Sequence, residues 1–77
     1  MYEIQRKLIK DIFNDMVKKG NKKIRILNLR IYDEKDNIHA FADISYMWSL
    51  NGWEKSVNHH DMVFVYKDGV WHSPLFC

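Results

Sequence analysis

The sequence predicts an α+β fold in which one N-terminal helix packs on a four-stranded antiparallel meander sheet, giving two layers. Three observations lead to this prediction. Apolar residues first recur at helical spacing, they then alternate with the period of a β-strand, and Asn-Gly and Asp-Gly dipeptides separate the strand-like runs. We therefore expect a single domain over residues 1–77.

The predicted helix covers residues 2–19. Its apolar side chains are spaced so that they form one stripe, while lysine and arginine lie on the other side. Gly20 follows the stripe, and a glycine in the left-handed conformation commonly ends a helix. The apolar positions are Ile4, Leu8, Ile9, Ile12, Phe13, Met16 and Val17.

The four strands are predicted at about 23–32, 38–49, 53–67 and 70–76. In the first of them the alternation slips by one residue between Ile26 and Leu27, and a β-bulge would accommodate that slip. Two-residue turns at Asn51-Gly52 and Asp68-Gly69 fix the register of the hairpins, because both dipeptides favour positive φ. The predicted opposite pairs are Tyr46 with Val57, Ile44 with His59, and Tyr66 with Trp71.

This layout is similar to that of the cystatin-like and NTF2-like groups, in which a single helix lies across a curved antiparallel sheet. No sequence motif accompanies the likeness. It therefore implies the two-layer arrangement and assigns no role to any residue.

The composition excludes several classes of protein. A chain with 47% hydrophobic residues and a net charge of +2 is not intrinsically disordered, and no apolar run approaches the roughly 20 residues of a membrane span. The single Cys77 excludes an intramolecular disulfide and a cysteine metal cluster. We expect a cytoplasmic protein with no cofactor and no membrane partner. The bias toward Lys, Ile and Asn is typical of low-GC genomes, including many phages.

Apolar residues are more numerous than one helix can cover. Phe41 and Met47 alternate with the expected core residues of their strand, and Trp53 follows a turn. In the third strand, either Val63 and Val65 point outward, or Met62, Phe64 and Tyr66 do. A strongly curled sheet with residues 75–76 folded beneath it would enclose part of this surface; otherwise it marks an interaction site.

The leading hypothesis is a small non-enzymatic module that binds a protein partner or forms a homodimer through an exposed sheet face. Small size and sequence bias suit a phage- or mobile-element-encoded inhibitor of a host or defence protein. The residues expected to carry this binding are Phe41, Met47, Trp53 and Phe64.

A second hypothesis is nucleic-acid binding, because residues 1–37 hold 10 basic and 6 acidic residues. The basic residues concentrate where the helix gives way to the first strand. This cluster consists of Lys18, Lys19, Lys22, Lys23 and Arg25.

A third hypothesis is a ligand or enzymatic pocket between helix and sheet, with His39, Asp43 and His59 as its candidates. We do not expect catalysis, since the chain is short for enclosing a substrate. We expect no metal site at His59-His60-Asp61 either, because neighbouring residues of a strand point to opposite faces.

Overall fold

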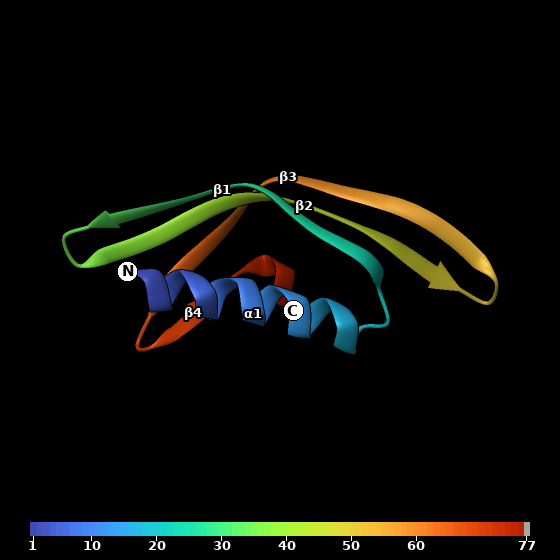
Figure 1. Cartoon of the computed structure of the whole chain (residues 1–77), viewed down its shortest axis with the longest axis horizontal. Coiled ribbons are helices and arrows are strands. Elements are labelled where there is room, and N and C mark those ends of the chain that lie inside the picture. Colours follow the sequence, from blue (N-terminus) through green and yellow to red (C-terminus); the bar gives the residue numbers. More distant parts are fainter. Residues whose placement is uncertain (77) are drawn as a thin grey trace.

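The fold of the protein is α+β, as predicted: one N-terminal helix and an open four-stranded antiparallel meander (Figure 1). The computed structural model describes residues 1–76. The sheet order is β1-β2-β3-β4, and the helix lies beneath the arched sheet, on its concave side. The elements are α1 (Tyr2–Lys18), β1 (Lys22–Glu34), β2 (Asn37–Leu50), β3 (Trp53–Lys67), β4 (Val70–His72) and a 3₁₀ turn (Pro74–Phe76).

Helix α1 buries the centre of the predicted stripe, whereas Phe13 and Val17 at its margin are 38% and 64% exposed. The helix ends in the predicted way. Leu8, Ile12 and Met16, each four residues apart, are at most 1% exposed. Gly20 has φ +84°, and the amides of Gly20 and Asn21 donate hydrogen bonds to the carbonyls of Val17 and Met16. These two bonds form a Schellman motif, which satisfies carbonyl groups at the end of the helix.

Both predicted hairpin turns form with the predicted register. Tyr46 lies opposite Val57 and Ile44 opposite His59 across the first turn, and Tyr66 lies opposite Trp71 across the second. Asn51, Gly52, Asp68 and Gly69 all have positive φ, as a two-residue hairpin of this type requires.

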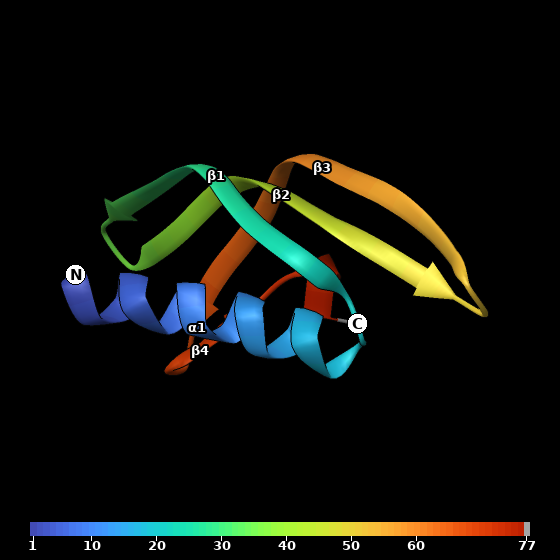
Figure 2. The same ribbon diagram turned by 45° about the vertical axis from the view of Figure 1, so that its right-hand side comes forward.

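The predicted irregularity in β1 is present, but it lies slightly later in the strand. The register shifts between Leu27 and Arg30, and Asn28 has φ 53°. Leu27 is therefore turned out and 42% exposed, while Ile26 and Leu29 pack on the core. Two more shifts are present, one at the start of β1, where Lys23 has φ 54°, and one in β3, where Asp61 has φ 54°. Bulges bend the strands that carry them, and Figure 2 shows the sheet arching over the helix.

The C-terminal segment closes the core from one side. Strand pairing ends at His72, so the predicted last strand is shorter than 70–76, and Leu75 folds under the sheet with 6% exposure. The indole Nε1 of Trp71 donates to the carbonyl of Ile4 at 3.0 Å. The ammonium of Lys19 donates to the carbonyl of Leu75 at 2.7 Å. The buried core consists of Leu8, Ile12, Met16, Ala40, Ala42, Ile44, Phe64, Trp71 and Leu75.

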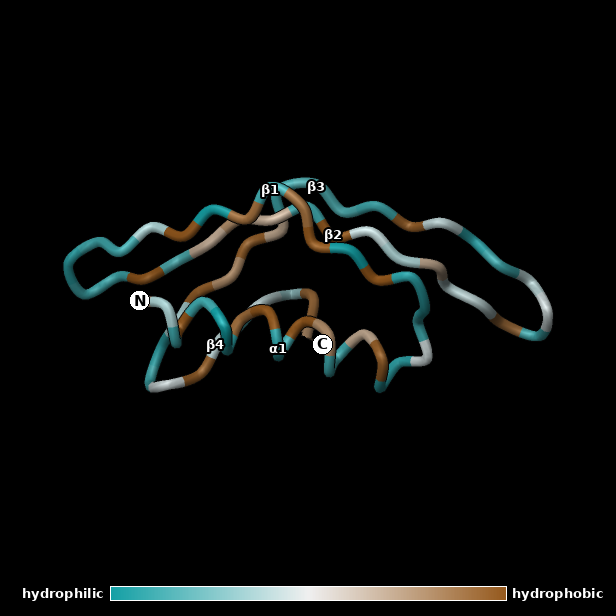
Figure 3. Tube along the Cα trace, viewed as in Figure 1, coloured by the Kyte–Doolittle hydropathy of each residue, from teal (hydrophilic) through white to brown (hydrophobic). Residues whose placement is uncertain are grey.

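The hairpin of β2 and β3 extends past the helix. We call residues 48–55 the hairpin arm. Strand β1 begins beside it, since Lys22 pairs with Met47. Strand β4 pairs only with residues 65–67, so the outer edge of β3 is unpaired along the arm in the described part of the chain. Figure 3 shows hydrophobic segments along the helix and the middle of the sheet, between hydrophilic turns. Within residues 1–76, no helix has the length and apolar character needed to cross a membrane.

Candidate protein-binding face

The four residues predicted to bind a protein do not form one surface. Phe41 and Met47 lie on the convex face of β2 and are partly exposed, but six residues of strand, about 20 Å, separate them. Trp53 is 79% exposed on the arm, whereas Phe64 is fully buried in the core. The bulge at Asp61 sets this orientation of β3. Of the two sets of β3 residues that could point outward, the structure exposes Val63 and Val65. Phe64 is therefore not part of the candidate surface.

The convex face carries a row of aromatic, aliphatic and histidine side chains that crosses all four strands. Tyr32 pairs with His39, His39 with Val65, and Val65 with His72; in the next row Phe41 pairs with Val63. Directly opposite residues share a face, and this is the face turned away from the helix. Tyr32, Val63 and Val65 are 42%, 42% and 39% exposed. We call these six residues, Tyr32, His39, Phe41, Val63, Val65 and His72, the convex patch.

Ring contacts hold the aromatic part of the convex patch in place. Tyr32 and His39 stack with centroids 5.3 Å apart, and Phe41 meets both rings edge-on at 6.0 and 5.8 Å. The guanidinium of Arg30 lies 5.8 Å from the centroid of Phe41. Nδ1 of His39 is buried and has no hydrogen-bond partner among the described residues. Stacking thus positions this ring, so the patch presents a preformed surface.

A hollow adjoins the convex patch where β4 ends. It has a volume of about 500 Å³, and Val63, Val65 and His72 belong to both its lining and the patch. It forms because β4 is only three residues long and the chain turns under the sheet at Pro74. The rest of its lining is Trp71, Ser73, Pro74 and Phe76.

A polar cluster at the top of the arch separates the convex patch from the arm. The carboxylate of Asp43 accepts hydrogen bonds from Nδ2 of Asn28 at 2.8 Å and from the backbone amide of Asp61 at 3.0 Å. These two hydrogen bonds hold the pKa of Asp43 below its usual value, and the bond from the Asp61 amide has the larger effect. Arg30 pairs with the Asp61 carboxylate at 2.7 Å. Asn28 and Asp61 are thereby bonded to β2, which gives Asp43 a structural role.

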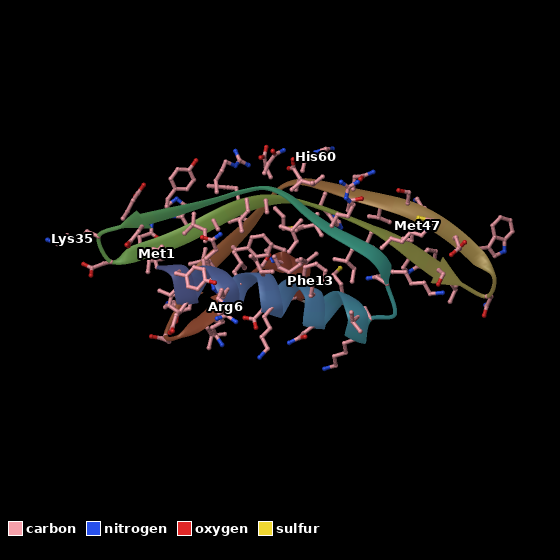
Figure 4. All side chains as sticks on the ribbon, in the orientation of Figure 1. Met1, Arg6, Phe13, Lys35, Met47 and His60 are labelled. Atoms are coloured by element: carbon pink, nitrogen blue, oxygen red, sulfur yellow. The ribbon has the colours of Figure 1, made fainter. Side chains whose placement is uncertain are left out.

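The structure does not bring the three pocket candidates together. Asp43 and His39 lie on the convex face, whereas the ring of His59 lies on the other face, 3.0 Å from the hydroxyl of Tyr46. His60 points away from the helix at the top of the arch (Figure 4), with its side chain 80% exposed. In residues 1–76, no three His, Cys, Asp or Glu side chains are placed to hold a metal ion. Cys77 lies outside the described residues.

The basic cluster is divided by its contacts. The Lys19 ammonium is bound by the Leu75 carbonyl and by the Asp15 carboxylate, 2.9 Å away. Lys18, Lys22 and Lys23 are exposed at one end of the molecule, and Arg25 pairs with Ser45 on the convex side. A separate hollow of about 270 Å³ lies on the helix, lined by Glu3, Arg6, Lys7 and Lys10.

Sequence reasoning missed Tyr32 and His72 as members of the convex patch. Each comes from a different strand than Phe41, and their neighbourhood depends on the register across the bulges. The signal available in the sequence was the short polar residue inside each strand-like run, Asn28 and Asp61, since Asn and Asp tolerate positive φ better than most residues. Comparison of this chain with models of known families, with curated proteins and with solved structures finds no match.

Proposed function

We propose that the protein is a non-enzymatic binding module whose convex patch docks on a protein, either a foreign partner or a second copy of the chain. The observation that carries this proposal is the group of partly exposed Tyr32, Phe41, Val63 and Val65 on the side opposite the helix, in rows that two histidines extend across all four strands. In a two-layer domain the outer face of an antiparallel sheet is ordinarily polar.

The chemistry of the convex patch supports the same proposal. Aromatic rings, arginine and a neighbouring hollow are the features found where a few residues supply most of the binding energy. Phe41 with Arg30 above it provides such a centre, and the hollow beside Val63 offers room for one side chain of a partner. The polar cluster around Asp43 borders the patch, as a polar rim does at a protein interface. Inhibition of a host or defence protein is the narrower form of this proposal, and it rests on size and sequence bias.

The test compares two matched double variants. Phe41→Ser with Val63→Ser removes the centre of the convex patch, whereas Met47→Ser with Ser56→Ala changes an opposite pair on the same face outside it. Light scattering first establishes whether the wild type is a dimer, and affinity capture then identifies a foreign partner if it is a monomer. We expect the dimer or the captured partner to be lost in the first variant and kept in the second. Equal binding by both folded variants would refute the role of the patch.

A further inference from the structure

The hairpin arm presents a second surface, and aromatic rings dominate it. Trp48 and Leu50 continue the alternation that buries Ala42 and Ile44, but they lie beyond the helix and are 42% and 55% exposed. Trp53 lies opposite Leu50 and is 79% exposed. The core-facing side of the β2–β3 hairpin is therefore exposed to solvent along the arm, where it carries two tryptophans.

The two indoles are placed as neighbours. Trp48 lies opposite Lys55, and Trp53 lies two residues before Lys55 on the same strand and face. The backbones of such diagonal neighbours in an antiparallel pair are about 7–8 Å apart. The arm thus carries two tryptophans at diagonal positions of one face, and Lys55 is a neighbour of both.

The fold brings cations from the N-terminal half of the sequence to this arm. Lys22 pairs with Met47 at its base, and Lys23 follows. Helix α1 ends at Lys18 on the concave side of the sheet, at the same end of the molecule (Figure 1). The residues near this end are six basic (Lys18, Lys19, Lys22, Lys23, Arg25 and Lys55) and two acidic (Asp15 and Glu54).

The other end of the molecule carries charges of both signs. Its two turns hold four acidic residues, Asp33, Glu34, Asp36 and Asp68, and two basic ones, Lys35 and Lys67. Figure 4 places Lys35 at one end of the long axis and Met47 toward the other, and the long axis extends 46 Å. The start of α1, with Glu3, Arg6 and Lys7, lies at the Lys35 end as well (Figure 1). The excess of cations at the arm end is therefore the feature that attracts an anionic partner.

From this juxtaposition we infer that the arm end binds single-stranded nucleic acid. Trp48 and Trp53 stack on two bases, while Lys18, Lys23 and Lys55 contact phosphates. Proteins that bind single strands combine exposed aromatic rings with cations in this way. A duplex fits less well, because its bases are already stacked on one another and an exposed indole finds no free base face. The site is separate from the convex patch and does not depend on the proposed protein-binding function.

Fluorescence anisotropy with a labelled ten-residue deoxythymidine oligonucleotide, at about 50 mM salt, tests the inference. Three phosphate contacts at about −0.7 each give a log–log salt slope of about −2. Trp53→Ala and Trp48→Ala should each weaken binding at least about fivefold, since stacking is lost. Trp53→Phe should retain most of the affinity because it keeps a ring. Lys55→Ala should reduce the salt slope by about 0.7.

Two matched controls separate this site from the rest of the molecule. Lys10→Ala removes a helix cation outside the arm end and should leave the salt slope unchanged, and Phe41→Ser alters only the convex patch and should leave oligonucleotide affinity unchanged. The inference is overturned by an absence of binding, by undiminished binding of Trp53→Ala, or by tighter binding of the matching duplex. Binding to anionic phosphatidylserine vesicles, or to an acidic protein, with none to the oligonucleotide, also overturns it.

Discussion

Replacing Phe64 by alanine tests the placement of β3, on which the convex patch depends. Phe64 is fully buried, and Phe64 and Phe76 have their ring centroids 5.9 Å apart. Truncating a buried phenylalanine costs about 3–5 kcal/mol, because apolar contacts are lost and a cavity remains. A chain of this length has a total unfolding free energy of about 4–12 kcal/mol. The variant should therefore lose a large part of its stability.

The neighbouring Val63 is the matched control. It lies on the convex face with 42% exposure, so Val63→Ala should cost less than about 1 kcal/mol. Urea unfolding followed by circular dichroism measures both, and Phe64→Leu replaces the alanine variant if that one is unfolded in water. A shift of one residue in the register of β3 would exchange the two faces. A larger loss for Val63→Ala than for the Phe64 variant would thus refute the placement of the bulge and of the patch.

Two further predictions concern the polar cluster and the first turn. The folded pKa of Asp43 is lowered, so its carboxylate stabilises the fold above the unfolded value of 3.8, and this contribution is lost as the pH falls through the folded pKa. Between about pH 5 and pH 2, the urea midpoint of Asp43→Asn should therefore fall less than that of the wild type; an equal fall would contradict the role given to the carboxylate. Gly52 has φ +85° with open space where a Cβ would stand, so Gly52→Ala should lower the free energy of unfolding by about 1 kcal/mol through backbone conformation alone. Gly52→Asn should lower it less, because asparagine tolerates positive φ better. Equal losses for the two variants in urea unfolding would argue against that explanation.

The sequence allowed the elements and the hairpin registers to be predicted because their determinants are local. The stripe of α1 ends at Gly20, and the turns at 51–52 and 68–69 fix pairings that extend along whole strands. These features depend on a few adjacent residues whose backbone preferences agree with the pattern around them.

The composition of the exposed surface could not be predicted in the same way. Whether Val63 or Phe64 points outward depends on the bulge at Asp61, and that bulge is held by Asp43 from another strand. The basic cluster likewise lies close to the arm because Lys22 pairs with Met47, which is 25 residues later in the sequence. Contacts between distant segments carry no local pattern.

The meander order has a consequence for how the chain folds. Each strand pairs with the one that precedes or follows it in the sequence, so every step of sheet formation closes only a short loop and loses little chain entropy. Contacts between the two ends of the chain, such as that of Trp71 with Ile4, span 67 residues and can form after the hairpins have already drawn these ends together. A topology of this kind has a low contact order for a β-rich protein, which favours rapid folding.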